Sequence, residues 1–323
     1  MNLSIIFVNY KTPELIIECL DSVYKFNKNL DFEVIVVNNA SKADDEVYVK
    51  KHYPTVIWHD MGYNAGFGRA NNTGMRIAKG KYFLILNTDT IMIDNSIEKC
   101  FNHLENRPDA IAGGAYQLYS DLTSRTFYHT FTFRKDFWIV PPQFRRHLDK
   151  IFKFTKFDDD QQVDYIAAAF LMIRREGFEK TGGFDEEFFM YGEDTYFGYQ
   201  LSKFGKNLLF KDCKIIHNEW GSSPERYNET QSYTYFNRFD PQIQLSNIVW
   251  YRKQYGVIPF LLLMIHYWVW VLVFCTLKVI LNLSKFKSPF ANFDNQTRFA
   301  KLIGLFSKYF WKILFKVPTF YKI

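Results

Sequence analysis

SIIFVNY, residues 4–10, is a short apolar run that ends in the polar pair Asn9-Tyr10. A run of this length without helical spacing is typical of a buried strand. Helical spacing follows it directly at residues 13–24, with Thr12 as a possible N-cap. Further strand patterns lie at residues 33–37, 55–58 and 82–86, and helical patterns lie between them at 44–52 and 69–78. This alternation predicts an α/β fold of βαβ units with a mostly parallel sheet flanked by helices.

Three of the predicted strands turn polar where they end. The polar residues are Asn9-Tyr10, Asn38-Asn39 and Asn87-Thr88-Asp89. In sheets of this kind, ligands bind at the carboxyl ends of the strands. The convergence of the three ends therefore predicts one polar site.

Composition excludes some classes of protein. A net charge of +6 over 323 residues is too small to indicate nucleic-acid binding, and the lysines lie beside apolar segments. We expect no nucleic-acid partner. The four cysteines are scattered, with no CxxC pair and no histidine at zinc-ligand spacing, which predicts reduced thiols in a cytosolic protein. The apolar run at residues 3–8 is too short for a signal peptide.

The chain changes character after about residue 250. Residues 257–277 contain no Asp, Glu, Lys or Arg and are long enough for a membrane-spanning helix. Basic residues flank both ends, with Arg252 and Lys253 before and Lys278, Lys285 and Lys287 after. A single span would place one basic cluster outside, against the positive-inside tendency. The pattern therefore favours a helix that lies in, or re-enters, the cytoplasmic leaflet.

Residues 301–315 predict an amphipathic helix, with Lys301, Lys308, Lys312 and Lys316 opposite an apolar face. Such a helix could lie on anionic lipid or pack on its own domain. The apolar stretch before it favours the membrane. We therefore predict an α/β domain at 1–250 and a membrane-associating helical region at 251–323. The protein would be peripheral or monotopic on the cytoplasmic side of the inner (plasma) membrane.

Four motifs offer chemistry, and each also has a purely structural interpretation. The glycine-rich segment 64–74 could bind phosphate or form only a turn. Asp89 could bind a divalent cation or cap a turn, and His217 could be a metal ligand or simply hydrogen-bonded. The acids Glu193 and Asp194 could supply a general base or occupy a first helical turn.

Taken together, the motifs resemble the inverting family 2 glycosyltransferases with a GT-A fold. The nearest branch resembles the rhamnosyltransferase-type enzymes of bacterial surface-polysaccharide assembly. The resemblance runs from Leu3 to about Ser223 and rests on residues 4–10, 36–41, 64–74, 87–90, 182–185 and 191–194, with His217.

The resemblance implies roles for individual residues. Asp89 matches the final acid of the metal-binding DxD-type motif, and His217 matches a second ligand to the same Mg²⁺ or Mn²⁺. Asp194 matches the catalytic base, with Glu193 supporting it. The nucleotide-sugar-binding positions would be Asn9, Tyr10, Asn38, Asn39, Asn64, Gly66, Phe67, Asn71, Asn72 and Asn87. Asn38 departs from the family's usual Asp, and Asn87 replaces the first acid of DxD.

The implied activity is transfer of a sugar, rhamnose in the branch that it resembles, from a nucleoside-diphosphate sugar to a lipid-linked oligosaccharide or glycan acceptor. The nucleotide-sugar half would span about 1–114 and the acceptor half about 115–250. Two alternatives stay open: transfer to polyprenyl phosphate, and a non-catalytic sugar- or lipid-binding scaffold. The joint presence of Asp89, Asp194 and His217 argues against the scaffold.

Overall fold

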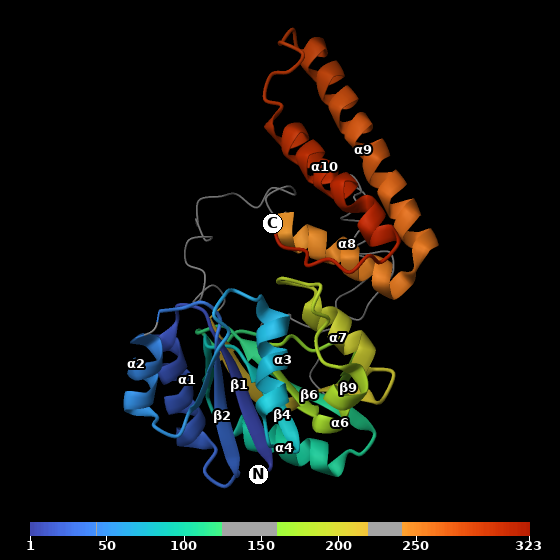
Figure 1. The fold of residues 1–323 in the computed structure, drawn as a ribbon. Helices are drawn as coiled ribbons and strands as arrows, with labels where there is room; N and C mark the ends of the chain where they lie inside the picture. Colours follow the sequence, from blue (N-terminus) through green and yellow to red (C-terminus); the bar gives the residue numbers. More distant parts are fainter. Residues whose placement is uncertain (43, 125–159, 219–240) are drawn as a thin grey trace. The chain divides into compact units, whose positions relative to one another are not determined.

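The computed structural model describes residues 1–42, 44–124, 160–218 and 241–323 (Figure 1). These residues form two compact units, one made of 1–124 with 160–218 and the other of 241–323. Residues 125–159 of the predicted acceptor half, and the end of the family resemblance at Ser223, lie outside the described residues.

Nine strands of the first unit form one mixed sheet, in the order β3-β2-β1-β4-β8-β6-β9-β5, with β7 also paired to β9. Four of them run parallel to one another: β1 (Leu3–Asn9), β2 (Phe32–Asn38), β3 (Ile57–Asp60) and β4 (Tyr82–Leu86). The remaining strands are β5 (Thr90–Met92), β6 (Ala110–Leu118), β7 (Gln161–Val163), β8 (Phe170–Arg174) and β9 (Lys206–His217). The predicted α/β architecture is confirmed.

Helices cover both faces of this sheet (Figure 1). They are α1 (Pro13–Phe26), α2 (Asp44–His52), α3 (Phe67–Ile77), α4 (Ser96–Asn106), α6 (Arg175–Thr181) and α7 (Glu193–Leu201). Alternate residues of β1 enter different cores. Ile5 and Phe7 pack with α1, and Ile6 packs with α3. A strand buried on both faces has no polar side to expose, which explains the continuous apolar run in the sequence.

One local prediction needs correction. Thr12 stands at the N-cap position of α1 but makes no capping hydrogen bond, and its hydroxyl lies 3.2 Å from that of Thr88. Strand β9 is continuous over its twelve residues. A bulge between Phe210 and Lys214 interrupts its pairing with β6.

The described residues of the second unit form α8 (Pro241–Tyr255), α9 (Val257–Ser284) and α10 (Asp294–Leu314). The helix α8 runs across the predicted boundary at residue 250. Helices α9 and α10 lie side by side (Figure 1). Ring contacts join them as the pairs Phe260–Phe310, Tyr267–Phe306 and Phe274–Phe299. Because the pairs advance along α9 as they retreat along α10, the two helices form an antiparallel hairpin.

The hairpin revises two expectations about the charged and apolar surfaces. The Arg252 guanidinium is buried and donates to the carbonyl oxygen of Leu314 at 2.7 Å and 3.1 Å, so it caps α10 and does not face lipid. The apolar face of α10, which includes Phe306, is covered within the unit, so it is not the predicted lipid-binding face. Its lysines are exposed as expected.

Among the described residues, α9 is the one helix long and apolar enough to cross a membrane, and only 22% of its most apolar window is buried. The core helix of a soluble protein would be mostly buried. Exposed apolar side chains therefore gather on α9, among them Ile258, Leu262, Ile265, Val269, Leu272 and Ile280.

Candidate active site

The short strand β5 brings the two predicted metal ligands together. Thr90 of β5 pairs with His217 at the end of β9, and the Asn218 N–H donates to the carbonyl oxygen of Asp89 at 3.0 Å. Asp89 Oδ1 then lies 3.2 Å from His217 Nε2. Both side chains are buried. The structure thus places a carboxylate oxygen and an imidazole nitrogen side by side at one edge of the sheet.

Gln117, on β6, determines how His217 faces Asp89. His217 Nδ1 lies 2.8 Å from Gln117 Oε1, an acceptor, so Nδ1 carries the ring proton. In the neutral ring Nε2 then bears the lone pair; it lies 3.2 Å from Asp89 Oδ1, with the Asn87 amide 3.5 Å away. The imidazole nitrogen and the carboxylate oxygen can together bind a divalent cation, and Mn²⁺ accepts both ligand types. Sequence reasoning missed Gln117, because only the register of β6 against β9 places it here.

The predicted acids Glu193 and Asp194 open α7. The two residues before them, Tyr191 and Gly192, have left-handed φ angles of 67° and 76°. This turn reverses the chain direction and presents the acids at the start of the helix. Asp194 Oδ1 accepts hydrogen bonds from the backbone N–H of Thr195 at 2.7 Å and from its hydroxyl at 3.3 Å. Glu193 is buried, and its Oε2 finds no hydrogen-bond partner among the described residues.

These surroundings give the two acids different protonation behaviour. Burial, and then the charge of Asp194, raise the pKa of Glu193 to about 8. Burial also raises the pKa of Asp194, but the backbone N–H groups of Thr195 and Ala168 oppose that rise by hydrogen-bonding to the carboxylate. At neutral pH Glu193 is therefore mainly uncharged, and Asp194 is the member of the pair that ionises first.

A short loop connects the acids to the metal-ligand pair. Asp194 accepts a hydrogen bond from the Ala168 backbone, and the carbonyl oxygen of Ala169 accepts one from the Asn87 N–H at 3.1 Å. Asn87 is also beside His217. Asp194 is thus linked to Asn87, the neighbour of His217, through one side-chain and one backbone hydrogen bond to the consecutive residues Ala168 and Ala169.

The predicted nucleotide-binding asparagines at the strand ends hold one another. Asn9, Asn38 and Asp60 occupy matching positions on three adjacent strands. The Asn9 amide donates to Asn38 Oδ1 at 3.1 Å and to Asp45 Oδ2 at 2.9 Å, and Asn38 donates to Asp60 Oδ2 at 3.4 Å. Asn9 and Asn38 are fully buried, whereas Asp60 is exposed. Asp45 and Asp60 were not predicted as site residues, because neither lies in a recognised motif.

A second set of amides braces the glycine-rich turn. Asn39 donates to Asn64 Oδ1 at 3.2 Å and accepts from the Ala65 N–H at 2.7 Å. Both residues lie beside the turn, and Tyr10 is exposed on the neighbouring strand end. Asn39 and Asn64 therefore fix the path of the chain into α3.

The turn itself packs against the loop that carries the acids. Gly66 has a φ of 83°, and a Cβ there would lie 2.3 Å from the carbonyl oxygen of Phe189. The same oxygen accepts the N–H of Phe67 at 3.0 Å. Glycine is thus required at position 66 for close packing, and the first N–H of α3 is already engaged by protein.

Helix α3 continues this bracing. Asn72 donates to the carbonyl oxygen of Phe184 and accepts from its N–H, both at 2.8 Å. Asn71 is buried and donates to the carbonyl oxygen of Phe67 at 3.0 Å. These amides position the loop that leads to Glu193 and Asp194. Direct contact of Gly66, Phe67, Asn71 and Asn72 with a nucleotide sugar stays a prediction.

Comparison with known proteins gives a family match. The sequence model described as Glycosyl transferase family 2 matches residues 4–182, more than half of the chain. The O-antigen biosynthesis protein RfbC of Myxococcus xanthus is 27% identical over 65% of this chain and 17% of its own length. Rhamnosyltransferase WbbL of Escherichia coli K12 is 28% identical over 59% of this chain and 75% of its own length. The chain spans 17%, 58% and 38% of the first three curated relatives that it matches.

Solved structures share the fold. A crystal structure of GalNAc-T7 with UDP, GalNAc and Mn²⁺ superposes with a TM-score of 0.52 at 18% identity, covering 67% of this chain and 44% of that one. Staphylococcus aureus TarS superposes with a TM-score of 0.51 at 15% identity, covering 79% of this chain and 44% of that one. At these identities the likeness shows the fold alone, which is the GT-A type.

The buried Glu193 carboxyl makes the stability of the fold depend on pH. Its pKa is about 8 in the folded chain against an ordinary value of 4.5. The folded chain therefore keeps a proton that the unfolded chain releases. This contribution to stability is complete below pH 4.5 and is lost as the pH rises through 8. We expect Tm, measured by scanning calorimetry, to fall less over this range in Glu193→Gln than in the wild type.

Glu18→Gln, at an exposed position on α1, is the matched control and should follow the wild type. An equal fall of Tm in wild type and Glu193→Gln would show that the Glu193 carboxyl is not held in its protonated form by the fold.

Proposed function

Since the chain belongs to glycosyl transferase family 2, we propose that it transfers a sugar from a nucleoside-diphosphate sugar to a hydroxyl group of a lipid-linked or glycan acceptor, with inversion, in surface-polysaccharide assembly. One observation carries the proposal: the contact of Asp89 with His217, joined through the Ala168-Ala169 loop to Asp194. The printed activities of two relatives, an O-antigen biosynthesis protein and a rhamnosyltransferase, support the polysaccharide assignment and make rhamnose the first donor sugar to test.

In this reaction Asp194 accepts the proton of the acceptor hydroxyl. The acceptor oxygen attacks the anomeric carbon from the side opposite the diphosphate, the bond from that carbon to the diphosphate oxygen breaks, and the anomeric centre inverts. Glu193 is uncharged at neutral pH, so it leaves Asp194 as the base and does not add a second negative charge beside it.

Asp89 Oδ1 and His217 Nε2 are the protein atoms that would hold Mg²⁺ or Mn²⁺. A bound divalent cation neutralises the charge that develops on the leaving diphosphate. GalNAc-T7, which shares the fold, was solved with Mn²⁺ and UDP, and this supports the same cofactor class here. Gln117 keeps the His217 proton on Nδ1, so that Nε2 remains available as a ligand.

Replacing Asp194 by Asn removes the base while keeping the shape of the side chain. Because a positioned general base contributes about 10²- to 10⁴-fold, we expect kcat to fall by that factor in a transfer assay with the donor sugar and acceptor. Glu193→Gln mimics the protonated acid and should change kcat at neutral pH much less. Full turnover by Asp194→Asn with an intact fold would remove Asp194 as the base.

Replacing Gln117 by Leu removes the group that orients His217. Loss of such a partner lowers metal affinity by about 10- to 100-fold, and we expect this loss for Mn²⁺ measured by calorimetric titration. Gln117→Glu keeps an acceptor oxygen facing Nδ1 and should retain binding. Equal Mn²⁺ affinity of Gln117→Leu and wild type would exclude the positioning role.

We further propose that the α9–α10 hairpin lies in the cytoplasmic leaflet and attaches the catalytic unit to the membrane. The exposed face of α9 is apolar, whereas α10 exposes Lys301, Lys308 and Lys312. Since α10 packs antiparallel along α9, a crossing α9 would carry these lysines into hydrocarbon, at about 2.5–3.5 kcal/mol or more for each. An in-plane hairpin places the apolar face in lipid and the lysines at the headgroups.

Leu272→Asp puts a charge on the exposed face of α9, where Leu272 is 70% exposed. Burying a leucine is worth about 1.5–3 kcal/mol, so we expect binding to phosphatidylglycerol vesicles in a flotation assay to weaken at least about tenfold. Val47→Asp, at a 70% exposed valine of α2 in the other unit, is the matched control and should bind as the wild type does.

The orientation of the hairpin is tested at its tip. A cysteine at Ser288, between α9 and α10, should stay unlabelled by an impermeant thiol reagent added outside intact cells, in a Cys275→Ser background. Labelling from outside would mean that the hairpin crosses the bilayer.

A further inference from the structure

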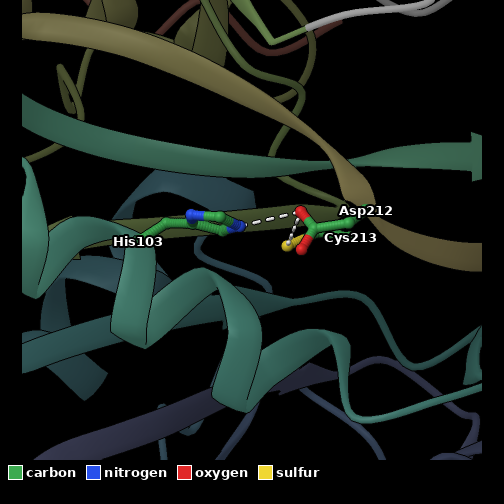
Figure 2. A group of neighbouring side chains, drawn as sticks. All are labelled: His103, Asp212 and Cys213. Atoms are coloured by element: carbon green, nitrogen blue, oxygen red, sulfur yellow. Dashed lines mark hydrogen bonds and ion pairs between the residues drawn. The ribbon is translucent and has the colours of Figure 1, made fainter.

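A second group of metal-binding side chains lies between α4 and the bulge of β9, among residues that the proposed reaction does not use. Cys100 and His103 are three residues apart on α4 and therefore share one face of the helix. The bulge, between Phe210 and Lys214, contributes Asp212 and Cys213. Figure 2 shows His103 pointing from the helix towards the side chains of Asp212 and Cys213.

The donor atoms of this group are already close. His103 Nε2 lies 2.8 Å from Asp212 Oδ1, and Cys213 Sγ lies 3.8 Å from the same oxygen. One ligand atom from each of His103, Asp212 and Cys213 lies within 4.8 Å of the others. The Cys213 thiol also hydrogen-bonds with Cys100, and both thiols are fully buried. One sulfur, one imidazole nitrogen and one carboxylate oxygen therefore converge, and the Cys100 thiol lies behind that of Cys213.

Neighbouring residues hold this arrangement in place. The ring of Phe210 stacks on His103, with centroids 4.5 Å apart and planes at 19°. Gly113 on β6 leaves the necessary space, because a Cβ there would lie 2.8 Å from Phe210 Cε2 and 2.9 Å from Cys100 Sγ. Lys99, which contacts the Asp212 carbonyl oxygen at 3.1 Å, is neutralised by Asp94 at 2.8 Å.

We propose that His103, Asp212 and Cys213 form a zinc site, separate from Asp89 and His217, with a fourth position left to solvent. Four-coordinate sites of sulfur, nitrogen and oxygen ligands are typical of Zn²⁺, whereas Mg²⁺ prefers oxygen ligands alone. Zn²⁺ binding would displace the Cys213 thiol proton to solvent and tie α4 to the strand that ends at His217. An ion pair between His103 and Asp212 alone would not explain the two thiols beside it.

A redox role for the thiols is less consistent with the structure. The hydrogen bond from Cys100, together with burial, raises the pKa of the Cys213 thiol. The pair therefore does not supply a reactive thiolate without a cation. The expectation that no histidine lies at zinc-ligand spacing was wrong, because His103 follows Cys100 by three residues. The other two ligands lie on a distant strand, so the sequence alone does not relate them to His103.

The full chain, stripped of metal and titrated with Co²⁺, tests the site. We expect a thiolate-to-cobalt charge-transfer band that saturates at one ion per chain and disappears when Zn²⁺ is added. Cys213→Ser should lose the band, and His103→Gln should weaken Co²⁺ binding at least about tenfold. Zn²⁺ should also raise Tm of the wild type more than that of His103→Gln.

Cys275→Ser, a thiol of the second unit, is the matched control and should keep the band. Asp89 and His217 contain no sulfur, so the band reports only the proposed zinc site, whether or not the transferase reaction is confirmed. Absence of the band in the wild type, or its persistence in Cys213→Ser, overturns the proposal. If Cys213→Ser does not fold, His103→Gln serves as the test instead, because His103 is partly exposed. Unchanged Co²⁺ affinity in His103→Gln overturns the proposal.

Discussion

The antiparallel pairing of β5 with the end of β9 is the constraint on which the candidate active site depends. β5 has only three residues, yet its hydrogen bonds to β9 fix Thr90 opposite His217 and so place Asp89 against the imidazole. Two buried groups of this kind are unfavourable unless each has a partner. Gln117 is the hydrogen-bond partner of His217 Nδ1. The other imidazole nitrogen, together with the Asp89 carboxylate, is suited to a cation.

Glu193 and Asp194 are positioned in a different way, because α3 hydrogen-bonds to the loop that leads to them. A buried amide must satisfy both its donor and its acceptor, and leaving one unpaired costs about 1–3 kcal/mol. Asn72 meets this requirement on the backbone of Phe184, and Gly66 allows the carbonyl oxygen of Phe189 to approach the start of α3. The glycine-rich turn and the loop that carries the acids are therefore parts of one hydrogen-bonded framework. That framework keeps Glu193 in a buried position that is unfavourable for its ionised form.

Much of this fold follows from the sequence alone. The apolar runs of β1 and β4 and the helical spacing of α1 and α2 are local signals, and they were sufficient to predict the parallel sheet. The joining of Asp89 to His217 was predictable only through family resemblance, because no local pattern relates residues so far apart. The roles of Asn9, Asn38 and Asn72 could not be separated from the sequence, since an asparagine that braces a loop and one that binds a ligand look the same. Gln117, Asp60 and the pairing of Cys100 with Cys213 depend on strand register and on a bulge, which are tertiary properties.

The C-terminal unit shows how tertiary packing changes the meaning of an amphipathic helix. The apolar face of α10 suggests lipid contact in the sequence, but the aromatic rings of Phe299, Phe306 and Phe310 are matched by rings of α9. Burial of that face leaves α9 with the exposed apolar surface and α10 with the exposed lysines. A single interfacial helix would carry both an apolar face and a basic face. Here the apolar surface belongs to α9 and the lysines to α10. Because their charges and apolar residues lie along the same length of the hairpin, the hairpin is amphipathic across its width, and this geometry suits the plane of a membrane surface better than a path through it.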